Sequence, residues 1–507
     1  MNKLSNLESK IIFLKSRFFL TRTLGYFSFF LIPIYVQKSL ILPYYLKILL
    51  MVLYSAFMLG QWFLLGKEID HRLKIYFEVN SSVDRIVYRL LLGMTFIFLV
   101  YNVLNFFTYK WSNNFFWFFW ILCGLFYSWP TRGKIIEESV STNFGDIKFL
   151  DSFEKTLLLL ICVFFVFSVP EFPKISSYNE LKTYFMKSLP LGSLFWTFLK
   201  MNYLPFLKYF SLFKVGFFIH FYFVGMGIFQ LIFYSLLRHF FGRRLALLGV
   251  FAVISSWSFS KILSANLISS HLSIYTVIWV WTGLWVVRSS TYKSGLFLGV
   301  IGFLIALIDP RVSLLILVHS AICYLFFVKY KMKWFQRQFF KYFSFGFILS
   351  ILTFLFWCFF SKGQVIRWDL GSFLVLKKNI LHELSEKAVF SLSFLGAGLV
   401  CFKYIYPMNK KISSGLFIDM KKMFLVLISL TSLALYAILI APSMISGFAI
   451  LWPIAFFCLI PIEFIFQLST RFRSNRNIIY LMYILICLLD SHFEGRVKIF
   501  LKLFEIS

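Results

Sequence analysis

Long runs of apolar side chains recur along this chain and limit its possible folds more than any other feature. Hydrophobic residues occupy 60% of the 507 positions, whereas charged residues occupy 14%. A water-soluble domain cannot bury that much apolar surface, but a membrane-spanning helix requires it over about 20 residues. The runs therefore predict an all-α, polytopic transmembrane protein with about 13 to 15 spans. Their centres lie near residues 30, 56, 97, 122, 163, 226, 251, 280, 302, 320, 352, 398, 432, 456 and 484.

The basic residues set the predicted orientation of these spans. Lys and Arg number 51 against 21 Asp and Glu. They gather in short clusters between apolar runs, which favours the inner face of a membrane over a nucleic-acid partner. With a cytoplasmic N-terminus and alternating spans, the basic clusters at 329–341, 409–422 and 469–476 all fall inside. We therefore expect a protein of the bacterial inner membrane that contacts membrane lipids and binds no nucleic acid. The arginines that fall outside are Arg311, Arg367 and Arg496.

Polarity along the chain divides it into predicted regions. Residues 1–130 form an N-terminal region of four spans, and residues 131–155 form a polar cytoplasmic loop. Residues 156–489 form the main transmembrane module, and residues 490–507 a C-terminal tail. Inside the module, residues 170–215 form a long outer loop with Leu and Phe at helical spacing, which predicts short helices lying in the membrane interface.

The segment LLRHFFGRRLALLG, from Leu236 to Gly249, begins a pattern that suggests an activity. A span ends in a short Phe-Gly-Arg-Arg loop, a Ser-Trp turn follows the next span, and a later Gly-rich span ends at Asp-Pro-Arg. Over residues 156–328 this pattern resembles the GT-C superfamily of membrane glycosyltransferases, especially its protein O-mannosyltransferase and aminoarabinose-transferase-like branch. The matching positions are Phe241, Gly242, Arg243, Arg244, Ser256, Trp257, Gly295, Gly299, Gly302, Asp309, Pro310 and Arg311.

The resemblance implies a GT-C-like helical module with 170–215 as its first long outer loop. It further implies a polyprenyl-phosphate-linked sugar donor, an acceptor on the outer face and an inverting displacement. The family carries an acid, commonly a pair, early in this loop, which makes Glu180 first and Glu171 second the candidate catalytic residues. Here the two acids are not adjacent, and four additional spans precede the module.

Basic residues on the outer side are the candidates for binding the phosphate of a lipid donor, because guanidinium groups bind phosphate in a bidentate manner. The class allows a divalent metal, but no ligand set in the sequence requires one. The resemblance thus predicts neither a metal site nor a further cofactor. The candidate phosphate-binding residues are Arg311, Lys362 and Arg367.

Each of these residues also has a simpler interpretation. Glu180 could be a solvated loop acid that pairs with Lys182 or Lys187. The outer basic side chains could extend to ordinary lipid phosphates without binding a donor.

Glu463 supports a different class of function. It lies in an apolar run, close to Pro453 and Pro461, and an ionised group at membrane depth costs about 2.5 to 3.5 kcal/mol. Such an acid suits a transporter or flippase of an amphipathic substrate, unless it lies close to the inner interface near Arg471. A non-catalytic scaffold for membrane assembly is the third hypothesis.

Overall fold

The computed structural model describes a helical protein over part of the chain. In the described ranges every labelled element is an α-helix and no strand occurs, so the predicted all-α class is confirmed for this part. Within it, none of the helices combines the length and the apolarity that crossing a membrane requires. The described residues are 59–60, 62–70, 82–107, 150–167, 227–256, 277–282, 297–302, 388–400, 429–430, 451–468 and 476–505, with single positions at 20, 23, 24, 46, 318, 348, 351, 352 and 355.

The chain divides into two compact units. The first comprises Met1–Phe149, Ile175–Val224 and Ser507, and the second Leu150–Lys174 and Gly225–Ile506. The first boundary between the two units, between Phe149 and Leu150, therefore falls within the polar segment 131–155.

In the first unit, two helices cross at a pair of glycines. The helix at 62–70 packs against α3 (Ser82–Phe107), and a Cβ added at Gly66 would overlap the backbone carbonyl of Arg89. A Cβ at Gly93 would likewise overlap the carbonyl of Trp62. Near this crossing, Arg89 Nε lies 3.2 Å from Asp70 Oδ2. The two backbones touch because neither glycine carries a side chain, as at close crossings of membrane helices.

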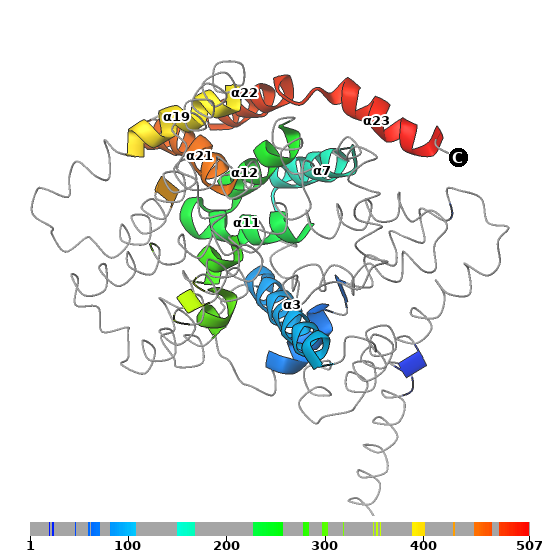
Figure 1. The fold of residues 1–507 in the computed structure, drawn as a ribbon. Coiled ribbons are helices and arrows are strands. Elements are labelled where there is room, and N and C mark those ends of the chain that lie inside the picture. Colours follow the sequence, from blue (N-terminus) through cyan, green and yellow to red (C-terminus); the bar gives the residue numbers. More distant parts are fainter. Residues whose placement is uncertain are drawn as a thin grey trace, which may run out of the picture. The chain divides into compact units, whose positions relative to one another are not determined.

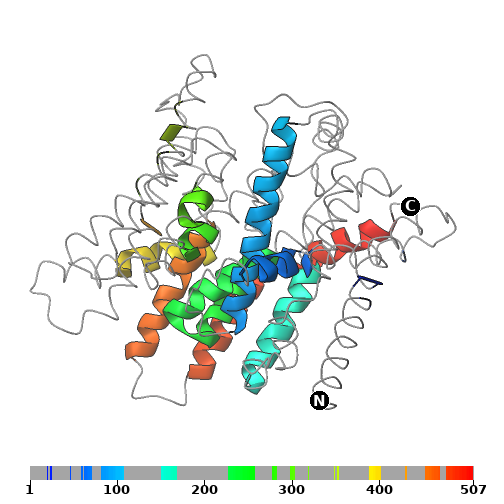
Figure 2. The ribbon, with the colours of Figure 1, turned by 90° about the horizontal axis from the view of Figure 1, so that it is seen from below.

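In the second unit, three helices pack together (Figures 1 and 2): α7 (Ser152–Phe167), α12 (Arg243–Ser255) and α22 (Arg476–Leu489). At their first turns, Glu154 binds Arg243, and the ring of Phe153 lies 5.2 Å from that of Tyr480. Near the last turns of α7 and α12, Phe164 meets Phe251 edge to face at 5.5 Å, and just beyond the ends of α12 and α22 Ser256 binds Asp490. These contacts place the three N-termini at one end of the unit and the three C-termini at the other.

Two further helices complete this packing. α11 (Gly227–Phe241) folds back along α12, and α21 (Leu451–Leu468) covers both. Phe456 on α21 packs edge to face on Phe240 of α11, with ring centroids 4.7 Å apart. A Cβ at Gly249 of α12 would lie 2.7 Å from Leu459 Cδ1. On the helix at 277–282, the fully buried Trp281 donates from Nε1 to Ser235 Oγ of α11 at 2.7 Å.

α19 (Ala388–Val400) packs along α21 at a glycine. A Cβ at Gly396 would overlap the carbonyl oxygen of Phe457 and lie 3.2 Å from Cδ of Pro461, whereas a Cβ at Gly398 would meet nothing within 4 Å. Gly396 therefore sets how closely the two helices approach, and Gly398 does not.

A sharp turn leads from α22 into the last helix, α23 (Phe493–Glu505). His492 in this turn has a φ of 45°, in the left-handed region. Residues 490–507, expected from the sequence to be a tail, thus contain a regular helix.

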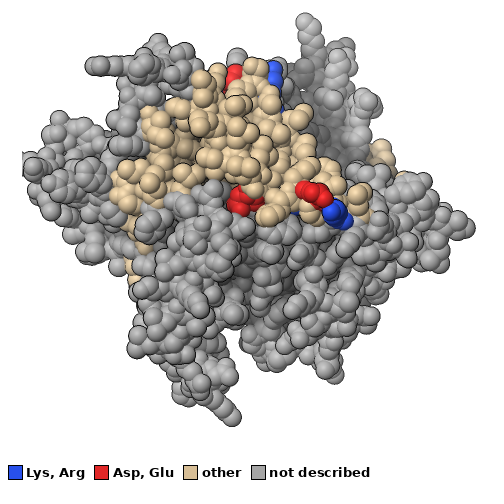
Figure 3. Space-filling model, turned by 90° about the horizontal axis from the view of Figure 1, so that it is seen from above, with Lys and Arg blue, Asp and Glu red and all other residues tan. Residues whose placement is uncertain are grey.

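Large apolar side chains are exposed along the outward faces of α7 and α22. Leu159 on α7 is 63% exposed and Leu489 on α22 is 84% exposed. Figure 3 shows that charged side chains are sparse on the described surface it draws. A face of this kind suits an apolar environment better than water. The exposed residues are Leu158, Leu159, Cys162 and Val166 on α7, and Ile478, Leu481, Met482, Leu485 and Leu489 on α22.

Replacing Gly396 by Ala should separate α19 from α21 and lower the free energy of unfolding by about 1 to 3 kcal/mol, because the new methyl meets backbone that cannot rotate away. Gly398→Ala, two residues along the same helix, is the matched control and should leave stability unchanged or slightly raised. Denaturant unfolding of the purified protein in detergent measures both. Equal losses in the two variants would contradict the close packing of Gly396.

Candidate functional site

The described residues with the most elaborate polar geometry lie at the start of α7. Asp151 is the N-cap, and its Oδ1 accepts a 2.7 Å hydrogen bond from the backbone N–H of Glu154. Glu154 returns the bond, because its Oε2 accepts from the backbone N–H of Asp151 at 3.1 Å. This reciprocal arrangement is a capping box, which satisfies two backbone donors that a helix start otherwise leaves without partners.

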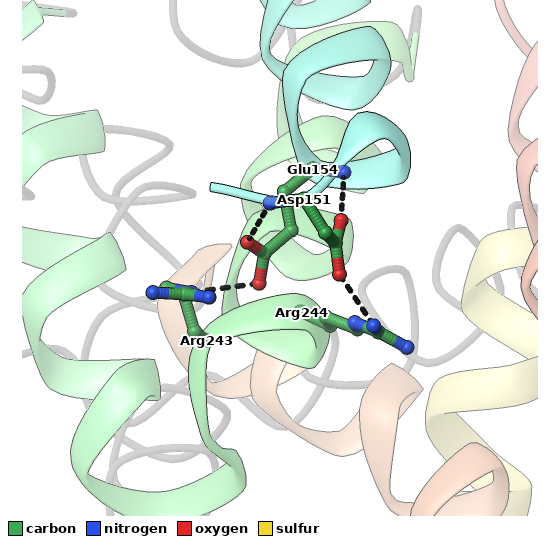
Figure 4. Close-up of polar contacts among 4 residues, drawn as sticks. All are labelled: Asp151, Glu154, Arg243 and Arg244. Carbon is green, nitrogen blue, oxygen red and sulfur yellow. Dashed lines mark hydrogen bonds and ion pairs between the residues drawn. The ribbon is translucent and has the colours of Figure 1, made fainter. Parts of the chain in front are cut away.

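The other oxygens of the same two carboxylates bind arginines from a distant part of the chain (Figure 4). Arg243 Nε donates to Glu154 Oε1 at 2.7 Å. Arg244 Nη2 donates to Asp151 Oδ2. Each carboxylate therefore caps α7 with one oxygen and holds the start of α12 with the other. We call Asp151, Glu154, Arg243 and Arg244 the arginine–carboxylate cluster.

Gly242 makes this cluster possible. It is the single residue between α11 and α12, and its φ of 85° lies in the left-handed region that glycine adopts without strain. Its N–H donates to Arg238 O at 3.1 Å, and its carbonyl accepts from Ala246 N–H at 3.1 Å. The chain thus ends one helix and starts the next within one residue, and both following arginines reach the first turn of α7.

The two ion pairs differ in their exposure to water. The Glu154 side chain is 1% exposed and its partner Arg243 is 32% exposed, whereas Asp151 and Arg244 are 33% and 43% exposed. The hydrogen bond from Arg243 to Glu154 raises the pKa of the guanidinium, against the opposing effect of its burial. Removing Arg243 would therefore leave a buried carboxylate without the guanidinium that binds it.

Asp151 titrates below its ordinary range. Burial raises the pKa of its carboxyl, but the hydrogen bond from the Glu154 backbone and the hydrogen bond and charge of Arg244 lower it. The net pKa lies below the ordinary value of 3.8. Asp151 is consequently ionised, and paired with Arg244, throughout the neutral range.

A second polar group closes the opposite end of α12. Arg496 of α23 is fully buried and donates to the backbone carbonyls of Ile254 and Ser255, the last residues of α12, at 2.9 and 2.6 Å. It also donates to Ser491 O at 2.7 Å. These bonds satisfy carbonyls that the end of a helix leaves without intrahelical partners.

Two contacts extend this group. The Arg496 guanidinium carbon lies 5.9 Å from the ring centroid of Phe164, within cation–π range. Ser256 Oγ donates to Asp490 Oδ2 at 2.9 Å, and both residues are buried. Both clusters hold helix ends in place.

Of the residues singled out from the sequence as candidate site residues, Glu463 lies within the described ranges. Glu463 is on α21, is partly exposed and makes polar or electrostatic contact with other residues. The arginine–carboxylate cluster and the group around Arg496 are built from other helices and do not include Glu463. The candidates Glu180, Glu171, Arg311, Lys362 and Arg367 lie outside the described residues.

Within the described ranges, no group of three His, Cys, Asp or Glu side chains could hold a metal ion. No family model, curated protein or solved structure matches the chain.

The partners of the Phe-Gly-Arg-Arg loop were not predicted from the sequence. A signal for half of the cluster was present in LDSFEKTLLLL, where Asp151 and Glu154 stand three residues apart just before an apolar run, the pattern of a capping box. The pairing with Arg243 and Arg244, 89 and 93 residues further along, has no local signature.

Arg243→Gln should lower the free energy of unfolding by about 3 kcal/mol, because it leaves the Glu154 carboxylate buried without its arginine. Arg244→Gln should cost less than about 1 kcal/mol, since water already surrounds that pair. Adding Glu154→Gln to Arg243→Gln should restore part of the loss, because glutamine still completes the capping box and carries no charge. Unfolding in denaturant measures all three, and equal effects of the two arginines would contradict the difference in burial.

Acid should remove the contribution of Asp151 only at low pH. Because its folded pKa is depressed, the stability it contributes is complete above the unfolded value and is lost as pH falls through the lower folded value. The difference in melting temperature between the wild type and Asp151→Asn should therefore stay constant from about pH 8 to pH 5 and shrink below about pH 4. A difference that disappears by about pH 6 would refute this assignment.

Proposed function

We propose that the protein is an integral protein of the bacterial inner membrane with a cytoplasmic N-terminus. Support comes from the apolar runs of the sequence and from the exposed apolar faces of α7 and α22, which would contact lipid tails. Two polar clusters of the described second unit lie where helices begin and end, the arginine–carboxylate cluster and the group around Arg496. Apolar flanks with polar ends suit helices in a bilayer.

The common direction of α7, α12 and α22 agrees with the proposed orientation. The predicted spans centred near 163, 251 and 484 are the fifth, seventh and fifteenth, so strict alternation requires all three to run the same way. It also places the arginine–carboxylate cluster on the cytoplasmic side and Arg496 on the outer side. Strict alternation would make α21, the fourteenth predicted span, begin on the outer side. Phe456 near its start instead packs on Phe240 beside the Gly242 turn, at the end assigned to the cytoplasm, so alternation does not account for α21.

For the activity, we propose transfer of a sugar from a polyprenyl-phosphate carrier to an acceptor on the outer face. The observation that carries this proposal is the resemblance to GT-C enzymes centred on Phe241 to Arg244. Both arginines of this motif are engaged in ion pairs at the start of α7, so the motif would orient helices rather than act on substrate.

The chemistry would then fall to the outer segments. Glu180, or second Glu171, would accept the proton of the acceptor hydroxyl as that oxygen attacks the anomeric carbon and the lipid phosphate departs. Arg311, Lys362 and Arg367 would stabilise the negative charge on the leaving phosphate. A divalent metal could assist there, although no ligand set requires one.

A transporter or flippase is the second candidate function, favoured by Glu463. This acid lies two residues beyond Pro461, the proline inside α21, and proline removes a backbone donor and weakens the helix at that point. An acid beside such a break could serve a path for a polar headgroup. A scaffold for membrane assembly is the remaining alternative.

Glu180→Gln should reduce the release of polyprenyl phosphate from a polyprenyl-phosphate sugar in proteoliposomes by at least about 100-fold, because general-base catalysis contributes about that much. Glu463→Gln is the control and should keep the transfer rate. Unchanged release in Glu180→Gln would exclude this residue from the mechanism. Movement of the lipid across the vesicle bilayer that survives in Glu180→Gln and fails in Glu463→Gln would indicate transport. Absence of both phosphate release and lipid movement in the wild type would favour the scaffold.

A further inference from the structure

We propose that α23 lies flat in the outer interface of the membrane, with its apolar side against the phospholipids. This inference rests on the proposed membrane location, and it assigns a lipid-binding surface to a segment expected from the sequence to be a tail. Three features of α23 support it: its anchoring, the level at which it begins and the distribution of its side chains.

The first turn of α23 is fixed to the ends of other helices. Arg496 is fully buried against the last carbonyls of α12. The Phe493 ring lies 5.3 Å from that of Phe164 and 5.6 Å from that of Phe167, at the end of α7. α23 therefore starts at the level where α7 and α12 terminate.

The boundary between apolar and polar surroundings lies at the same level. Leu489, the last residue of α22, is 84% exposed, and it ends the apolar face that begins at Ile478. The next residue is the buried Asp490, which is bonded to Ser256, and His492 then turns the chain through a positive φ. Figure 2 shows α23 turning away from the direction of α7 and α22 at this point. If the face of α22 contacts lipid tails, α23 begins where the headgroups begin.

The side chains of α23 suit that position. Its sequence, FEGRVKIFLKLFE, alternates apolar and charged residues at helical spacing. Phe493 and Leu501, eight residues apart and hence on one side, are 39% and 53% exposed. Glu494 and Lys498 form an exposed ion pair at 2.6 Å, and Leu501 lies three residues beyond Lys498, so the apolar side and the charged pair adjoin on the exposed part of the helix. A short helix with an apolar side and charged flanks is the type that binds along a membrane surface.

Lipid is favoured over a second copy of the chain as the occupant. The exposed apolar face of α22 ends at Leu489, four residues before the partly exposed Phe493 of α23, so one environment can cover both. Lysine ammonium groups at the edge of such a helix can reach lipid phosphates while the apolar side chains point toward the acyl chains.

Photo-crosslinking in native membranes tests this arrangement with the full-length protein. A benzophenone amino acid would replace Leu501, Lys498 or Leu485 in separate variants, and phospholipid adducts would be detected by mass spectrometry. We expect phospholipid adducts at position 501 and at position 485 on α22, and fewer at position 498.

Three outcomes would overturn the proposal or its premise. Lipid adducts at 485 with none at 501 would overturn the interfacial position of α23 while preserving the membrane proposal. A crosslink from 501 to a second copy of the chain would replace lipid by a dimer contact. Absence of lipid adducts at both positions would instead count against the membrane location itself.

Discussion

The backbone N–H and C=O groups at the helix ends, rather than in the helix interiors, are the groups that the second unit must supply with hydrogen-bond partners. The first N–H groups and the last C=O groups of a helix have no partners within it, and leaving them unpaired among apolar side chains is costly. Here the start of α7 is closed by Asp151 and Glu154, and the end of α12 by Arg496. In both cases the closing side chains also tie one helix to another, so satisfying the backbone aligns the ends of α7, α12 and α22.

Local sequence predicts the helices and some of their breaks. It predicts less of how the helices pack against one another. Apolar runs suffice to predict helices, and Gly242 before two arginines predicts a break. The partner of each arginine could not be inferred, because an ion pair across 89 residues depends on packing that no periodicity encodes. Arg496 was placed on the outer side, where arginines usually extend toward water, and its full burial results from carbonyls that only the folded α12 presents. The candidate site around Glu180 remains a prediction from sequence.

Glycines show the same limit on sequence-based inference. Gly396 and Gly398 stand in one apolar stretch and look equivalent, yet a methyl group would collide with the α21 backbone at the first and meet open space at the second. Gly66 and Gly93 form a reciprocal contact in the first unit, again visible only when both helices are present. In apolar sequence, the importance of a glycine is decided by the neighbouring helix.

The joint at Gly242 has a mechanical consequence. One residue separates α11 from α12, and the N–H and carbonyl of that residue are bonded into the two helices. The two helices are therefore joined without a flexible loop. A tilt of α11 would move Arg243 and Arg244, and through their ion pairs the start of α7. Binding of a substrate or partner that tilts α11 would in this way rotate the first turn of α7.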